Sequence, residues 1–309
     1  MKPVRDKLGL ASWGAAFCAG LWLALAGPAA AQQGILLRDP AVCGGSDSAF
    51  SEAAAKNAES LTNAQWSPFG SPEKGWETYL PMVQRELGTS CGPGTPEFAR
   101  KLAELQAAHG LEVDGLFGSG TFQVLKGLWQ ERRPFILARL RGECPVAPVE
   151  YIMTNLPARE DTYNREDRRL RGDALKAYRE MVAAARRDGV LRGDDKLLTI
   201  FSGYRQADVD SERCASEGNC DGKRRATCSP HATGYAVDLN LGFAPGSRVD
   251  STAAANRLYQ SRTAAYRWMV RNAGRFGFVN YIYEPWHWEW VGEPRDAAST
   301  AQPAAYTGQ

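Results

Sequence analysis

The residue types that could do chemistry in this chain are concentrated in its last third. The whole sequence holds three histidines. His231 is followed seven residues later by Asp238, and His287 is preceded three residues earlier by Glu284. Two imidazoles and one carboxylate are an ordinary ligand set for catalytic zinc, which keeps a fourth position open for water. A further carboxylate nearby would be the general base, so this pattern indicates a hydrolytic zinc site.

Amide hydrolysis at neutral pH needs each of these parts. The nucleophile must be stronger than free water, and the negative charge of the tetrahedral intermediate must be stabilised. Expulsion of the amine needs an acid, so one carboxylate must act in both directions. Taken singly, His231, Asp238 and Glu284 also fit an ordinary loop, strand and turn position. The prediction therefore rests on their combination.

Three separated blocks carry these residues, in the order Ser202-Gly203-Tyr204-Arg205, then Ser229-Pro230-His231 with Gly234 and Asp238, then Glu284-Pro285-Trp286-His287. Over roughly 197–292 the chain resembles the VanY-type D-alanyl-D-alanine carboxypeptidases, which belong to a wider group of zinc peptidases. The resemblance implies one Zn²⁺ per chain, held by His231, Asp238 and His287. It implies Glu284 as general base and acid and Arg205 as the oxyanion stabiliser.

The same resemblance implies that the substrate is peptidoglycan. Ser229 would contact the substrate backbone, and Tyr204 and Trp286 are further candidates for substrate binding. For Trp286 and its neighbours Trp288 and Trp290, core packing is the alternative interpretation. The implied reaction is hydrolysis of stem peptides, with release of the terminal D-Ala as the leading hypothesis.

Other activities on the same peptides stay open. Many carboxypeptidases of this group carry a Gln a few residues after the Arg, where it holds the terminal carboxylate. Here the corresponding stretch is Gln206-Ala207-Asp208-Val209-Asp210. A D,D-endopeptidase and an L,D-carboxypeptidase therefore remain alternatives. A non-catalytic wall-binding protein is the alternative of another class, although a disused site has no reason to keep Glu284 and Arg205.

The elements that must position these residues indicate an α+β domain over 151–295. Helix patterns occur at 173–187, with Asp173 as its expected cap, and along one long stretch at 253–276. Strands are expected at 197–201 and 235–239. A closing strand pair is expected at 278–283 and 288–291, in a small antiparallel sheet.

A small helical domain over 76–140 precedes it, with helices expected at 76–87, 98–110 and 121–129. Residues 98–132 resemble the three-helix peptidoglycan-binding type 1 domain, through Leu105-Gln106, Gly110-Leu111, Val113-Asp114-Gly115, Phe117-Gly118 and Thr121. Asp114-Gly115 supplies a turn that tolerates positive φ, and Thr121 could cap the third helix. We expect a loosely structured segment at 32–75, with one short helix near 51–61, and a linker at 141–150.

The N-terminus predicts export. Lys2, Arg5 and Lys7 precede an apolar run that closes with Ala29-Ala30-Ala31, which is typical of a secretory signal peptide over 1–31 cleaved near Gln32. We therefore expect a periplasmic or secreted protein with no stable membrane anchor after cleavage. The tail at 296–309 is polar and expected to be disordered.

Six cysteines remain after the signal peptide and fit disulfides in an exported chain. Sequence alone does not choose among the possible pairings of Cys43, Cys91, Cys144, Cys214, Cys220 and Cys228. A disulfide within 214–228 would brace the loop that leads to Ser229 and His231.

The overall charge excludes one class of partner. Lys and Arg number 37 and Asp and Glu number 35, which leaves a net charge of +2. The chain therefore lacks the strong positive charge that is typical of nucleic-acid-binding proteins. The length of 309 residues is compatible with about two domains. No obligate protein partner is inferred.

Overall fold

The structure is a computed structural model that describes residues 43, 48–136, 141, 148–218 and 229–292. The predicted signal peptide, the tail at 296–309, and Cys144, Cys220 and Cys228 lie outside these residues. Within the described part of the chain, no helix has the length and apolar character that a membrane crossing requires.

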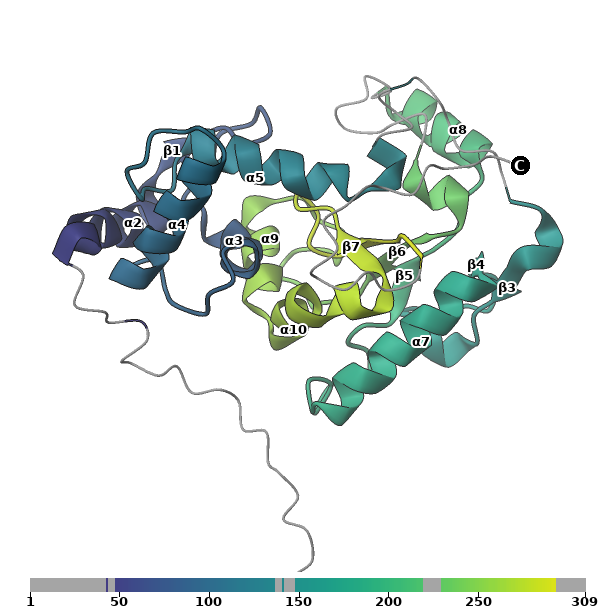
Figure 1. Cartoon of the computed structure of the whole chain (residues 1–309). Helices are drawn as coiled ribbons and strands as arrows, with labels where there is room; N and C mark the ends of the chain where they lie inside the picture. Colours follow the sequence, from purple (N-terminus) through teal and green to yellow (C-terminus); the bar gives the residue numbers. More distant parts are fainter. Residues whose placement is uncertain (1–42, 44–47, 137–140, 142–147, 219–228, 293–309) are drawn as a thin grey trace, which may run out of the picture. The chain divides into compact units, whose positions relative to one another are not determined.

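The first part of the chain, residues 48–136, is called the helical region below (Figure 1). Its helices predicted at 76–87, 98–110 and 121–129 are observed, together with a helix that covers the short one expected near 51–61. In chain order the elements are η1 (Ser48–Phe50), α2 (Ser51–Asn63), β1 (Gln65–Trp66), β2 (Glu73–Lys74), η2 (Glu77–Tyr79), α3 (Leu80–Glu86), α4 (Pro96–Ala108) and α5 (Ser119–Glu131).

Gln106 holds the turn between α4 and α5. Its Oε1 accepts hydrogen bonds from the backbone N–H groups of Asp114 (3.1 Å) and Gly115 (2.8 Å), and its Nε2 donates to Thr121 Oγ1 (3.2 Å). Gly115 has φ +67°, and a Cβ there would lie 2.8 Å from the carbonyl oxygen of Ala99. Thr121 is therefore not a helix cap as predicted. Gly118 is the N-cap of α5, and Thr121 lies inside the helix and bonds to Gln106.

A disulfide joins Cys43 to Cys91, with an S–S distance of 2.09 Å. Cys91 is buried in the helical region, just before α4. This bond establishes one of the pairings that the sequence left open. The pairing proposed within 214–228 falls largely on residues outside the described part of the chain, and the side chain of Cys214 is outside it too.

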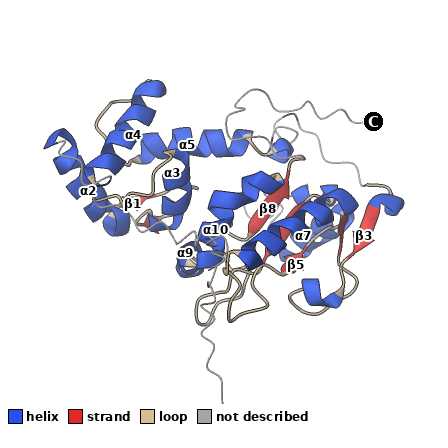
Figure 2. Cartoon of the chain, turned by 60° about the horizontal axis from the view of Figure 1, so that its bottom comes forward, coloured by secondary structure: helices blue, strands red, loops and turns tan. Residues whose placement is uncertain are grey.

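The rest of the described chain, residues 148–292, contains the residues that the sequence predicts to do chemistry, and for that reason it is called the catalytic region. Its elements are η3 (Glu150–Ile152), β3 (Met153–Asn155), η4 (Ala158–Glu160), β4 (Arg169–Arg171), α7 (Gly172–Arg187), β5 (Ile200–Ser202), α8 (Ala207–Glu217), η5 (Pro230–Thr233), β6 (Ala236–Leu239), α9 (Ala254–Arg262), α10 (Ala264–Asn272), η6 (Ala273–Phe276), β7 (Phe278–Asn280) and β8 (His287–Trp290). Helices and a small antiparallel sheet confirm the α+β class (Figure 2).

The main sheet has four antiparallel strands in the order β5-β6-β8-β7. β6 therefore lies in the interior of the sheet and is buried along its whole length. β8 pairs with β6 on one side and with β7 on the other. This order places the strand that bears Asp238 beside the strand that begins with His287.

The single long helix predicted over 253–276 is wrong. The chain forms α9 and α10, separated by Thr263 in an extended conformation (φ −66°, ψ 148°). The Thr263 hydroxyl accepts a hydrogen bond from the Tyr266 N–H (3.1 Å) and so caps α10. The cap of α7 also differs from expectation, since Arg171 is the N-cap and Asp173 lies in the first turn.

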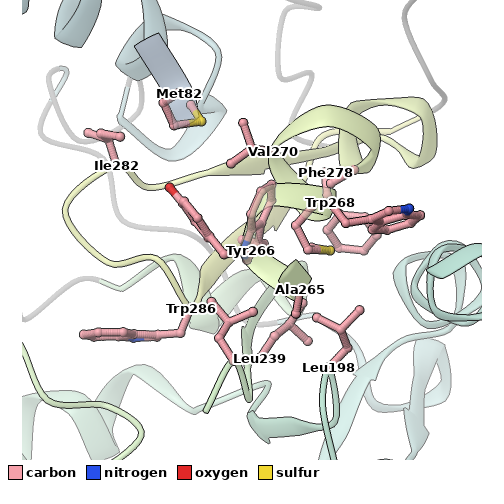
Figure 3. Close-up of a cluster of buried hydrophobic side chains, with 14 of the residues drawn as sticks. Met82, Leu198, Leu239, Ala265, Tyr266, Trp268, Val270, Phe278, Ile282 and Trp286 are labelled. Carbon is pink, nitrogen blue, oxygen red and sulfur yellow. The ribbon is translucent and has the colours of Figure 1, made fainter. Parts of the chain in front are cut away.

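The helical and catalytic regions share one hydrophobic core. Met82 of α3 belongs to the same buried cluster as Tyr266 and Val270 of α10, as Figure 3 shows. Trp76 and Tyr79 extend this cluster through the helical region. Both regions fall within one compact unit, residues 38–309.

A buried ion pair also joins the two regions. Arg257 of α9 is 2% exposed, and its Nη1 donates to Glu73 Oε1 of β2 at 2.8 Å. Its Nη2 donates to the Tyr79 hydroxyl (2.6 Å), which in turn donates to Glu73 Oε2 (2.6 Å). A second pair between α9 and the helical region, Arg262 with Glu77, is largely exposed on its arginine side.

These two pairs predict different stabilities for two matched variants. Glu73→Ala leaves the Arg257 guanidinium buried without its counter-charge and should lower the free energy of unfolding by about 3–5 kcal/mol. Glu77→Ala removes a solvent-screened pair and should cost less than about 1 kcal/mol. Urea unfolding of both variants, with the disulfide intact and chelator present, compares them. Equal losses in the free energy of unfolding would show that the buried pair contributes no more to stability than the exposed pair.

Candidate metal centre

The sheet register brings together ligands that are far apart in the sequence. Asp238 on β6 is the direct cross-strand partner of His287 at the start of β8. His231 lies in η5, which ends at Gly234 with φ +74° before the chain enters β6. The side-chain ligand atoms of His231, Asp238 and His287 all lie within 4.8 Å of one another, and all three residues are buried.

Asp238 stands between the two imidazoles. Its Oδ2 lies 3.2 Å from His231 Nε2, and its Oδ1 lies 2.9 Å from His287 Nδ1. The atoms that face one another are therefore one nitrogen from each histidine and the carboxylate oxygens. This is a compact set of three donors of the types that zinc prefers.

A backbone carbonyl fixes the ring of His231. Its Nδ1 lies 2.7 Å from the carbonyl oxygen of Gly203, so Nε2 is the nitrogen left for the metal side. Gly203 can bring its carbonyl there because it has no side chain, since a Cβ would lie 2.7 Å from the backbone oxygen of Arg169. The His231 N–H also donates to Ser229 Oγ (3.3 Å).

A carboxylate fixes the ring of His287. Its Nε2 lies 3.1 Å from Oε1 of Glu289, which leaves Nδ1 toward Asp238. Asn280 donates from Nδ2 to the His287 carbonyl (2.9 Å) and so holds the backbone of the same residue. Histidines that bind metals usually use their second nitrogen in this way, which sets the tautomer and the ring orientation. The residues present therefore fit a zinc ion.

The charges of His231, Asp238 and His287 influence one another's pKa values. Burial lowers the pKa of His231, assisted by the nearby Arg205 guanidinium. Burial alone would also lower the pKa of His287, but hydrogen bonds to Asp238 and Glu289 outweigh it and raise the pKa to about 9. Burial would raise the pKa of Asp238, yet the two histidines hold it well below its usual range. A pKa of about 9 makes the His287 ring an imidazolium near neutral pH, with a proton on each nitrogen.

Glu284, the predicted general base, lies in the turn between β7 and β8 and is half-buried. Burial raises the pKa of its carboxyl group. Its charge interacts with those of His287 and Asp238, which places it in the electrostatic field of the ligand group. A carboxyl group with a raised pKa is suited to accept a proton and return it near neutral pH.

Arg205 also faces the ligand group. Its Nη1 lies 4.0 Å from Asp238 Oδ2 and donates to Ser202 Oγ at 2.5 Å. Its Nη2 donates to Ser229 Oγ at 3.3 Å. Ser229, predicted to contact substrate, thus orients both Arg205 and the backbone of His231 in this structure.

Two predicted substrate residues have other surroundings. Trp286 is 3% exposed and belongs to the hydrophobic core, where Figure 3 shows it near Leu239. This agrees with the core-packing interpretation. Tyr204 is half-buried; its ring lies under the Arg169 guanidinium, 5.4 Å from ring centre to carbon, and its N–H donates to the Arg169 carbonyl.

Sequence reasoning missed Glu289, Asn280 and the Gly203 carbonyl. Glu289 had a local signal, because residues two apart on a strand share one face of the sheet. Asn280 and Gly203 are brought to the ligands by strand pairing and by a loop, so no local pattern indicates them.

Because the pKa of His287 is raised to about 9, we predict that zinc binding depends on pH. Zinc must displace a proton from His287, so affinity should rise roughly tenfold per pH unit between neutrality and pH 9, with about one proton released. Chelator competition and calorimetry in two buffers measure this. His109→Ala, which removes the exposed histidine of the helical region, should leave the slope unchanged. An affinity independent of pH would mean that His287 is already neutral.

Part of the chain is similar to known proteins. Residues 167–293 match the family model described as VanY, D-alanyl-D-alanine carboxypeptidase. No curated protein matches the chain. Solved structures similar to it include an LdcB LD-carboxypeptidase, at 22% identity and a TM-score of 0.36, with 48% of this chain and 71% of that chain covered.

Two VanY structures align as well, each over 49% of this chain and at 23% identity. One is VanYB in complex with D-Ala-D-Ala, with a TM-score of 0.32 and 83% of that chain covered. The other is a variant of a VanY D,D-pentapeptidase in complex with Zn(II), with a TM-score of 0.30 and 85% covered. The family match spans His231, Asp238, Glu284 and His287. Residues 167–293 therefore form a domain of the VanY D-alanyl-D-alanine carboxypeptidase family.

Proposed function

We propose that this protein hydrolyses peptidoglycan stem peptides with a single zinc ion, and that its main reaction is release of the terminal D-Ala. The observation that carries the proposal is the buried convergence of His231, Asp238 and His287 within 4.8 Å, in a domain of this family. Two imidazole nitrogens and one carboxylate oxygen that converge in this way are a donor set that zinc prefers. This arrangement of charges thus supports a metal-dependent hydrolase.

In the proposed reaction, the zinc ion, Glu284 and Arg205 each have a separate role. A zinc ion held by the three ligands would polarise the scissile carbonyl and activate a water molecule. Glu284 accepts the proton of the attacking water, and the same group then gives it to the leaving amine. Arg205, fixed by Ser202 and Ser229, stabilises the negative charge on the carbonyl oxygen.

The location proposed for this activity is outside the cytoplasm, in the periplasm or beyond the cell. Peptidoglycan is the proposed substrate, and the Cys43–Cys91 disulfide fits an oxidising compartment. The predicted signal peptide supplies the route. Binding of wall glycan by residues 98–132 is a separate proposal. Gln106, Gly115 and Thr121, which carry that resemblance, are engaged in holding the fold.

Replacement of the general base should separate chemistry from metal binding. Glu284→Ala should lower kcat on diacetyl-Lys-D-Ala-D-Ala by at least about 10²-fold, because the water loses its proton acceptor. Zinc content, measured by metal analysis, should stay at one per chain. Glu180→Ala, on the exposed face of α7, is the matched control and should be fully active. Loss of zinc in the Glu284 variant would instead make this residue a ligand.

Loss of the oxyanion-stabilising charge should appear mainly in kcat. Arg205→Met should lower kcat by about 10²–10³-fold with a smaller change in KM. Arg248→Met removes an exposed guanidinium from the same region and serves as the control. A variant whose KM alone rises would show that Arg205 binds the substrate rather than the transition state.

Defined muropeptides identify the bond that is cut. Mass spectrometry should show loss of one D-Ala from a pentapeptide stem, and this loss should stop when a chelator is added. Shortening of a tetrapeptide stem would establish an L,D-carboxypeptidase, and cleavage of cross-linked dimers an endopeptidase. A zinc-loaded protein that cuts none of these peptides would be a wall-binding protein.

A further inference from the structure

The helical region reaches the metal centre through Arg133, which follows α5. This side chain is 4% exposed, although it carries a charge. Its Nε and Nη2 donate to Oε1 of Glu289 at 2.9 and 2.5 Å. Glu289 Oε1 is the same oxygen that lies 3.1 Å from His287 Nε2. A continuous chain of contacts therefore runs from the helical region to a metal ligand.

Arg133 is itself held in one orientation. Its Nη1 donates to Gln130 Oε1 at 2.7 Å, within the last turn of α5. Its guanidinium lies over the ring of Tyr281, 4.1 Å from the ring centre. A planar guanidinium with a partner on each edge and on one face has little freedom to turn. The carboxylate of Glu289 is thus presented to His287 from a fixed direction.

The charge of Arg133 also explains why Glu289 can be there. Glu289 is 4% exposed and stands beside a second buried carboxylate, Asp238, on the far side of the His287 ring. A buried carboxylate without a cation is strongly disfavoured. Arg133 supplies that cation from outside the catalytic region. Its charge also acts on Glu284.

Arg257 ties the other end of the same segment to the helical region. Its Nε donates to the carbonyl of Tyr283 at 2.8 Å, directly before Glu284. The same guanidinium holds Glu73 and Tyr79 of the helical region. Phe69 of the helical region packs on the Tyr283 ring, with centres 4.8 Å apart. The segment that carries Glu284 and His287 is therefore held at both ends.

We propose that the helical region is a positioning element of the metal centre, and that Arg133 acts through Glu289 to set the orientation of the His287 imidazole. This inference rests on the proposed function, because it requires that His287 binds zinc. It differs from a wall-binding role for the helical region, which would act on the substrate and leave metal affinity alone. Arg133 is a positioning residue and does not touch the reacting atoms.

The test compares two neighbouring arginines in the full-length protein. Arg133→Met should weaken zinc binding by about 10–100-fold, the range typical of residues that orient a metal ligand. Arg132→Met removes a guanidinium that bonds to Glu86 within the helical region and should change zinc affinity less than about twofold. Chelator competition on the apo proteins gives both affinities. The visible spectrum of the Co²⁺-substituted protein should change for Arg133→Met alone.

A double-mutant cycle shows whether Arg133 acts through Glu289. The variant Arg133→Met/Glu289→Gln leaves no unpaired charge, so it should fold even if Arg133→Met does not. Its zinc affinity should equal that of Glu289→Gln alone, because the two residues form one path. Arg133→Lys keeps the charge without the planar fork and should recover part of the affinity.

Three outcomes overturn the inference in distinguishable ways. Equal zinc affinities for Arg133→Met and wild type, with only a lower melting temperature, would make Arg133 purely structural. A double variant about tenfold weaker than Glu289→Gln would show that Arg133 acts by another path. A wild-type protein without zinc affinity would remove the proposed function, and the positioning role with it.

Discussion

The structure depends on one buried carboxylate held between two imidazoles. Asp238 is 7% exposed and faces a nitrogen of His231 on one oxygen and a nitrogen of His287 on the other. Charges are costly to bury unless their geometry is satisfied completely. The interior position of β6, the direct pairing of Asp238 with His287, and the turn at Gly234 all serve that geometry.

Each imidazole then needs a partner on its outer nitrogen, and the two partners differ in kind. His231 uses the carbonyl of Gly203, which carries no net charge, and its pKa is lowered. His287 uses the carboxylate of Glu289, and its pKa is raised to about 9. A carboxylate partner makes the imidazole a stronger base and a stronger metal donor. The two histidines are therefore unequal ligands. Displacing His287 would change the electrostatic energy of the site more than displacing His231, because His287 has a carboxylate on each ring nitrogen.

The grouping of His231, Asp238 and His287 was predictable because these residues lie on short blocks whose order and residue types are visible in one sequence. The strands were predictable as well, since β6, β7 and β8 lie in short runs rich in apolar and aromatic residues. The break at Thr263 was not recognised, because continuous helix periodicity outweighed a single capping residue. The role of Arg133 could not be predicted from the sequence. This residue is separated from Glu289 by 156 residues, and the packing of the helical region against the catalytic region brings them together.

Apolar contacts already join the two regions, since Met82, Tyr266 and Val270 share one core. Buried ion pairs add little to stability compared with apolar side chains of equal size. Yet the described residues of the interface include two, Arg133 with Glu289 and Arg257 with Glu73, one at each end of the segment that bears Glu284 and His287. Hydrogen-bonded charges tolerate displacement far less than apolar contacts do, so they set the register between two surfaces. Both pairs lie beside the segment that bears Glu284 and His287. A shift in register between the two regions at this place would move His287, the proposed metal ligand.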